Sequence, residues 1–100
     1  MLAVSRFRIP VEGTERFLVE VREALDALAA RPGFVRGRVG RATDDPQSWI
    51  LSTEWDGVGA YRRALSSYDV KLRATEVFHR AEQEPSAFEV VEGVEPAAGG

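Results

Sequence analysis

Residues 14–41 read TERFLVEVREALDALAARPGFVRGRVGR, and this stretch decides the fold. Its first half predicts an amphipathic helix over residues 14–30, because apolar side chains recur at intervals of three and four residues. The apolar positions are Phe17, Val21, Ala24, Leu25 and Leu28. We expect Thr14 to cap the start of this helix with its hydroxyl. Residues 31–33, Arg-Pro-Gly, end the helix because proline cannot continue it, and residues 34–41 then predict a strand.

The segment before the helix predicts the first strand. Residues 2–9 are rich in β-branched and aromatic side chains and stop at Pro10. Successive side chains of a strand point to opposite faces. One face therefore carries Leu2, Val4, Arg6 and Arg8, and the other carries Ala3, Ser5, Phe7 and Ile9.

The segments after residue 41 predict two further strands. Residues 49–55 are the third strand of the chain, and residues 43–48 have the Asp, Pro and Ser content of a hairpin loop that would precede it. Residues 87–94 predict the last strand. The third strand shows one shared face, made by Trp49, Leu51, Thr53 and Trp55.

A second helical region lies between the third and the last strand. Residues 56–57, Asp-Gly, turn the chain into a helix, and residues 66–67, Ser-Ser, predict a break with a new N-cap. Residues 84–86, Glu-Pro-Ser, end the region. The apolar positions at helical spacing are Tyr61, Ala64 and Leu65 before the break, and Val70, Ala74, Val77, Phe78 and Ala81 after it.

The order βαββαβ predicts an α+β, ferredoxin-like domain, with a four-stranded antiparallel sheet and two helices on one face. The other face would expose Phe7, Ile50 and Val35, and an apolar patch of this kind marks an interface. We therefore expect a homodimer that pairs through the open face of the sheet. Residues 1–94 would form the domain, and residues 95–100 a flexible tail.

Composition excludes several classes of function. The chain has 100 residues, enough for one domain, and its formal net charge of −3 argues against nucleic acid. Arg36, Arg38 and Arg41 could suggest RNA, but the third strand lacks the pattern of RNA-recognition domains, and a solvated edge strand explains them better. With no cysteine and one histidine, His79, we expect no protein-bound metal. No stretch resembles a signal peptide or a membrane span, so a cytoplasmic location is expected.

Three short motifs resemble the antibiotic biosynthesis monooxygenase (ABM) domain family. They are Arg31-Pro32-Gly33-Phe34, Thr53-Glu54-Trp55 and Ala60-Tyr61, and the element order resembles the family over about residues 2–93. The resemblance implies a dimeric α/β barrel with a ligand pocket in each protomer between the sheet and the helices. The family includes oxygenases and haem-degrading enzymes as well as proteins of other roles.

The resemblance also implies candidate site residues. In quinone-forming members, a tryptophan that closes the third strand and a tyrosine six residues later line the pocket, and Trp55 and Tyr61 match this pair. Those enzymes carry an asparagine where this chain has Leu51. Their pocket arginine falls near Thr75, with Arg73 two positions away.

The haem-degrading branch matches less well. Its iron-binding histidine falls at about Ala74, its pocket tryptophan at Ala64 and its first-strand asparagine at Arg6. His79 lies more than one helical turn beyond Ala74, so haem binding is not expected.

Each candidate residue has a structural alternative. Trp55 could stack on a planar substrate or fill the core, and Tyr61 could bind or deprotonate a phenol or simply pack beside the core. Arg6 and Arg73 could anchor an anionic oxygen or form surface ion pairs. His79 could act as a base or interact with the carbonyl end of its helix.

Two hypotheses of function follow. In the first, the protein is a cofactor-independent monooxygenase that oxidises a small aromatic, such as a phenol, a hydroquinone or a polyketide-like ring, with O2. Its pocket would use Trp55, Tyr61, Leu51, Arg6 and Arg73. In the second, the protein is a dimeric, non-catalytic module that binds a small ligand or serves in assembly.

Overall fold

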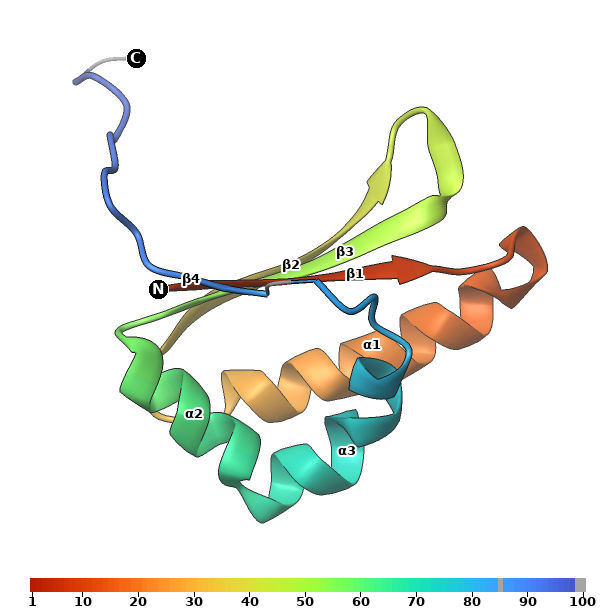
Figure 1. Ribbon diagram of the computed structural model, residues 1–100, viewed down its shortest axis with the longest axis horizontal. Coiled ribbons are helices and arrows are strands. Elements are labelled where there is room, and N and C mark those ends of the chain that lie inside the picture. Colours follow the sequence, from red (N-terminus) through yellow and green to blue (C-terminus); the bar gives the residue numbers. More distant parts are fainter. Residues whose placement is uncertain (85, 99–100) are drawn as a thin grey trace.

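The computed structural model describes residues 1–84 and 86–98 (Figure 1). Pro85, part of the predicted end of the second helical region, and residues 99–100 of the predicted tail lie outside these described residues. The elements, in chain order, are β1 (Leu2–Arg8), the 3₁₀ turn η1 (Val11–Gly13), α1 (Thr14–Ala29), β2 (Phe34–Ala42), β3 (Asp45–Trp55), α2 (Val58–Ser66), α3 (Tyr68–His79) and β4 (Ala87–Phe88).

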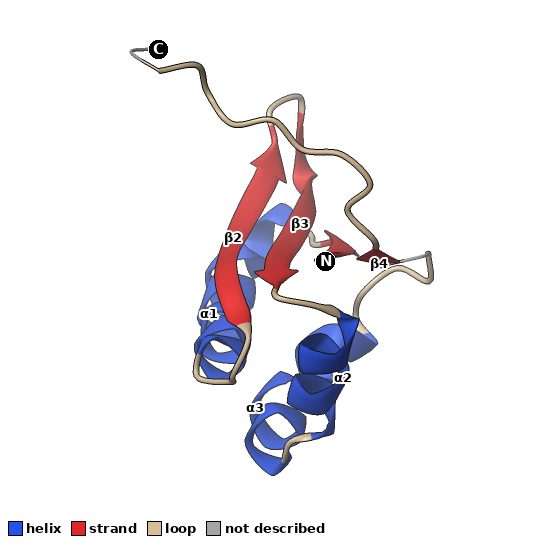
Figure 2. Cartoon of the chain, turned by 90° about the vertical axis from the view of Figure 1, so that its left-hand side faces the viewer, coloured by secondary structure: helices blue, strands red, loops and turns tan. Residues whose placement is uncertain are grey.

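The strands form one antiparallel sheet in the order β2-β3-β1-β4. All three helices lie on the same side of this sheet, as Figure 1 shows. Figure 2 shows the β2–β3 hairpin from another side, with α1 behind it. The predicted ferredoxin-like α+β class is confirmed, and the sheet of the single chain is open rather than closed into a barrel.

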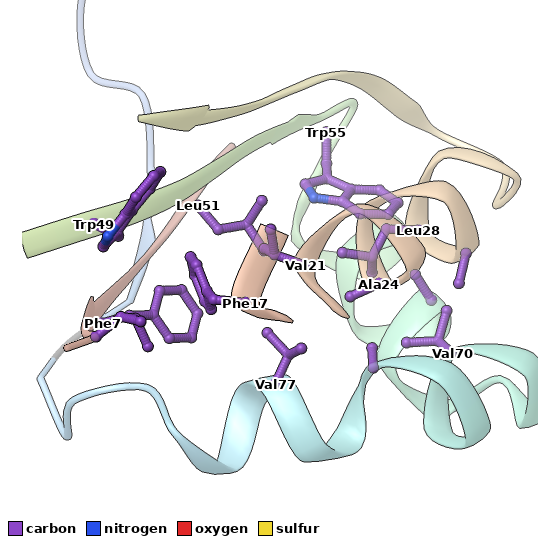
Figure 3. Packing of buried hydrophobic residues seen from close by; sticks show 14 of the residues in the cluster. Phe7, Phe17, Val21, Ala24, Leu28, Trp49, Leu51, Trp55, Val70 and Val77 are labelled. Carbon is purple, nitrogen blue, oxygen red and sulfur yellow. The ribbon is translucent and has the colours of Figure 1, made fainter. Parts of the chain in front are cut away.

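The core lies between the sheet and the helices (Figure 3). The predicted face of β3 is the buried one, since Trp49, Leu51, Thr53 and Trp55 are all at most 6% exposed. The assignment of Phe7 to the open face is wrong. Phe7 lies opposite Trp49 in the β1–β3 register, so it shares the helix-covered face and is 1% exposed. Ile50 and Val35 do stay exposed.

The predicted break in the second helical region is confirmed. The Ser67 hydroxyl accepts a hydrogen bond from the backbone N–H of Val70 at 3.3 Å, and α3 begins at the next residue after Ser67. The predicted role of Thr14 is wrong. Gly13 occupies the N-cap of α1, and the Thr14 hydroxyl donates instead to the carbonyl of Val11 at 2.7 Å.

The hairpin is tighter than the sequence predicts, because the turn is Thr43–Asp44 and β3 already begins at Asp45. The Asp45 carboxylate accepts hydrogen bonds from the Gln47 N–H and from an Arg8 Nη1, both at 3.0 Å. These two contacts lower the pKa of Asp45 from its usual value, with the Gln47 contact the stronger cause. Pro46 is tolerated here because the strand pairing is irregular next to it.

The last strand is much shorter than the predicted residues 87–94. In the antiparallel register Phe88 lies opposite Leu2, the first residue of β1, so the residues after Phe88 have no β1 residue left to pair with. The following segment leaves the sheet on the side opposite the helices (Figure 1). Its side chains Val90, Val91 and Val94 are exposed.

Gly33 holds the loop after α1 against α2. Its φ of 87° lies in the left-handed region, which side chains other than glycine rarely adopt. A Cβ at this position would lie 2.5 Å from the Ala60 Cβ, and the Gly33 carbonyl accepts the N–H of Asp56 at 2.8 Å.

Over the residues that the structure describes, no helix is long and apolar enough to cross a membrane.

Candidate functional site

A cavity of about 330 Å³ lies between the sheet and the ends of α2 and α3. One wall comes from β1, a second from α2 and a third from α3, and the segment that links α3 to β4 closes the fourth side. The lining residues are Ser5, Tyr61, Leu65, Phe78, Ala81, Glu82, Gln83, Glu84 and Ser86. The site therefore combines apolar walls with hydroxyl and carboxylate groups.

Tyr61 is the candidate residue that this cavity contains. It precedes Leu65 by one turn of α2, so both side chains reach the same wall. Its ring packs on the buried Trp55 indole, with the ring centroids 5.8 Å apart and the planes tilted by 56°. Burial raises the pKa of the Tyr61 hydroxyl above its ordinary value, and the nearby Ser86 hydroxyl offsets part of this effect. Tyr61 thus stays protonated at neutral pH and can donate a hydrogen bond.

Trp55 and Leu51 lie beneath the cavity. Both are 2% exposed and belong to the core cluster. The Trp55 indole N–H donates to the Thr53 hydroxyl at 2.9 Å. Phe34 meets the indole edge-on, with 5.2 Å between the centroids. Trp55 therefore reaches the cavity through Tyr61, whose ring it supports.

The structure places the two candidate arginines away from Tyr61. Arg6 pairs with Ile50 in the register and so faces the open side of the sheet, where its Nε lies 3.2 Å from the Glu84 carboxylate. Arg73 lies between α1 and α3. Its Nη1 is 3.1 Å from the Asp69 carboxylate and its Nε is 3.6 Å from that of Glu23.

His79 and the edge-strand arginines are exposed. His79 lies in the last turn of α3, as the sequence predicts. The Nε of Arg36 is 3.7 Å from the Glu54 carboxylate, and the Arg41 guanidinium lies 5.2 Å from the centroid of the Trp49 ring. In the described part of the chain, no three His, Asp or Glu side chains come close enough together to hold a metal ion.

Several lining residues were not predicted as site residues. Ser5 lies on the helix-facing side of β1, and Leu65 and Phe78 belong to the apolar faces of α2 and α3. Alternation and helical spacing signal that these side chains point inward. Neither pattern shows that they meet around one cavity, because that depends on how α2 and α3 pack together.

A second hollow of about 480 Å³ lies between the start of α2 and the segment that follows β4. Its lining includes Val58, Arg62, Phe88, Glu89 and Val90. Although this hollow is larger, half of its lining residues come from the exposed strand β4 and the segment that follows it. We take the Tyr61 cavity as the candidate site because β1, α2 and α3 supply three of its walls and because it contains the half-buried Tyr61 hydroxyl.

Comparison with known proteins gives a family and a fold. The family model described as antibiotic biosynthesis monooxygenase matches residues 1–82. No curated protein matches the chain by sequence.

Solved structures share this architecture over most of the chain. A mutant of SnoaB from Streptomyces nogalater, described as a cofactor-independent oxygenase, is 25% identical, with a TM-score of 0.80 over 95% of this chain and 96% of that chain. A structure described as antibiotic biosynthesis monooxygenase is 16% identical, with a TM-score of 0.68 over 95% of this chain and 100% of that one. A conserved protein from Methanosarcina mazei is 13% identical, with a TM-score of 0.69 over 86% and 84%. The last two show the fold alone.

Proposed function

Because the chain belongs to the antibiotic biosynthesis monooxygenase family, we propose that it is a monooxygenase that oxidises a small phenol or hydroquinone with O2 and without a bound cofactor. The observation that carries this proposal is the half-buried Tyr61 hydroxyl in a cavity whose apolar surface comes from Leu65 and Phe78. The likeness to SnoaB, a cofactor-independent oxygenase, supports the same class of reaction.

The reaction needs no outside reductant, because the substrate supplies all of the electrons. A ring C–H of the phenol becomes C=O, and the phenolic O–H also becomes C=O. One atom of O2 enters the ring, and the other leaves as water with the two hydrogens from the substrate. A deprotonated phenol can pass the first electron to O2 directly, so the protein has to orient the ring, exclude water and stabilise the anion.

The cavity offers groups for each of these tasks. Leu65 and Phe78 provide apolar surface for an aromatic ring. The Tyr61 hydroxyl would donate a hydrogen bond to the phenolate oxygen, and the Trp55 indole would hold the Tyr61 ring in place. In this proposal Leu51 contributes only to the core beneath the cavity, and Arg6 and Arg73 contribute charge from outside the cavity.

The experiment is oxygen uptake by the purified protein with a panel of hydroquinones and polycyclic phenols. We expect uptake that saturates with substrate and a quinone product that carries one ¹⁸O atom from ¹⁸O2. Heat-denatured protein serves as the control, since such substrates also oxidise spontaneously. A rate equal to this control for every substrate would reject the monooxygenase proposal.

A non-catalytic ligand-binding module is the second candidate. Two observations favour it. Leu51 stands where quinone-forming relatives have an asparagine, and Arg6 and Arg73 lie outside the cavity. A thermal-shift screen with the same compounds separates the two. Ligands that raise the melting temperature without any turnover would support the binding module.

We also propose that the protein is a homodimer in which the open sheet faces meet. Register places Arg6, Arg36 and Arg38 on that face beside the exposed Ile50. The segment after β4 rises on the same side and carries Glu89, Glu92 and Glu95 among its exposed valines (Figure 1). A second copy fits this face because its acidic segment complements the arginines and its valines would bury apolar surface.

Charge reversal tests the dimer by sedimentation. One variant carries Glu89→Lys, Glu92→Lys and Glu95→Lys, and the other carries Arg36→Glu and Arg38→Glu. The dissociation constant of each variant's homodimer should be about tenfold or more above that of the wild type, because like charges then face each other. An equimolar mixture should recover a heterodimer, since all charges are again complementary. Unchanged association of both variants, or a mixture that stays monomeric, would contradict the proposal.

A further inference from the structure

Thr53 is a buried polar side chain in the middle of an otherwise apolar cluster, with 3% of its surface exposed. It lies on the helix-facing side of β3, two residues before Trp55, so the two side chains share a face. Its neighbours across the sheet are small, with Ala3 opposite on β1 and Gly37 opposite on β2. The side chains of Leu25 and Phe34 fill the space above Gly37, and the Trp55 indole N–H reaches the Thr53 hydroxyl along the strand.

The indole of Trp55 is then held from three directions. Its N–H donates to Thr53 Oγ1 at 2.9 Å, Phe34 packs edge-on, and Tyr61 packs on the side of the cavity. The other tryptophan differs, because the structure gives the buried Nε1 of Trp49 no hydrogen-bond partner among the described residues. Thr53 therefore makes a specific bond that the general packing of the core does not supply.

We propose that Thr53 is a positioning residue, which fixes the Trp55 indole and through it the Tyr61 ring at the cavity. The bond also occupies the single N–H of the indole. Trp55 consequently acts as apolar support for Tyr61 and does not donate a hydrogen bond to substrate or oxygen. The kinetic consequences of this inference rest on the proposed function, whereas the claim that Thr53 fixes the Trp55 and Tyr61 rings does not depend on it.

The variants Thr53→Val and Thr53→Ser test the inference by NMR. Valine has nearly the same shape and no hydroxyl, whereas serine keeps the hydroxyl. We expect Thr53→Val to shift the Trp55 indole N–H signal and speed its hydrogen exchange, and to shift the Tyr61 ring signals. Thr53→Ser should leave all of these near their wild-type positions. Trp49 and the exposed Tyr68 supply internal references in the same spectra. An unchanged Trp55 indole signal in Thr53→Val would overturn the inference.

Kinetics test the positioning role. With a substrate that the wild type turns over, Thr53→Val should lower kcat about tenfold, in line with the loss of one hydrogen bond that orients the site. KM should change less than twofold, because Leu65 and Phe78 still form the binding walls. A wild-type kcat in Thr53→Val, with its Trp55 signal shifted, would overturn the positioning role.

Two further measurements keep the inference testable. If the valine variant does not fold, Trp55→Phe replaces it, because phenylalanine keeps an apolar ring beneath Tyr61 and lacks the indole N–H. A loss of more than 100-fold in kcat for Trp55→Phe would overturn the claim that Trp55 acts only as support. If the wild type shows no turnover with any substrate, the proposed function fails. Tyr61 ring signals that are identical in wild type and Thr53→Val would then overturn the positioning as well.

Discussion

Replacing Tyr61 with phenylalanine is expected to lower kcat for oxygen uptake about 100-fold, with little change in stability. The substitution removes the hydroxyl that, in the proposed function, donates to the phenolate, and it keeps the ring that packs on Trp55. A donor of this kind contributes on the order of 10²–10³ to the rate in water-excluded sites. Steady-state oxygen uptake with the best hydroquinone measures the effect.

Tyr68→Phe is the matched control for this prediction. Tyr68 begins α3 and is 79% exposed, so the loss of its hydroxyl should leave kcat within twofold of the wild type. Equal rates for Tyr61→Phe and the wild type would remove Tyr61 from the mechanism. The cavity would then keep only a binding role.

Replacing Phe17 with alanine is expected to lower the free energy of unfolding by about 3–5 kcal/mol. Phe17 is 0% exposed and joins two other aromatic rings, with centroids 5.2 Å from Phe7 and 5.5 Å from Trp49. The structure around it can collapse only partly, so a cavity remains in addition to the lost apolar burial. Urea unfolding followed by circular dichroism gives the free-energy difference.

Val19→Ala on the same helix is the control. Val19 is 69% exposed and faces solvent, so its truncation should change the free energy of unfolding by about 0.5 kcal/mol or less. A loss at Phe17 no larger than that at Val19 would mean that the sheet and α1 do not pack as described here.

The helices and the element order were predictable because their signals are local. Phe17, Val21 and Leu28 repeat with helical spacing, and all three are buried as predicted. The cap at Ser67 was also predictable, since a serine pair between two helical patterns is a strong local signal. The family resemblance then added the expected ligand pocket between the sheet and the helices and drew attention to Tyr61.

The errors concern properties that alternation alone does not determine. Alternation sorts the β1 side chains into two sets, but it does not say which set the helices cover, and Phe7 was assigned to the wrong side. The two arginines of the opposite set, Arg6 and Arg8, were the available sign that this set faces solvent. The length of β4 depends on where β1 begins, which is a property of the partner strand rather than of residues 87–94.

The candidate site shows the same limit. Tyr61 was found from a motif, whereas Ser5 and Ser86 approach it from segments more than 50 positions before it and 25 after it in the numbering. Arg73 is near the position of a family arginine, but its helix turns it toward Asp69 and Glu23. A side chain's distance from a motif in sequence does not give its direction in space.

The contact of Gly33 with Ala60 has a consequence for the width of the Tyr61 cavity. The two backbones meet with no space for another methyl group, and Ala60 immediately precedes Tyr61 on α2. Any bulkier residue at either position must push the first turn of α2 outward and carry the tyrosine with it. The width of this cavity is thus set partly by a pair of small residues that do not line it. Substitutions there offer a way to change which ring systems enter while every lining side chain stays the same.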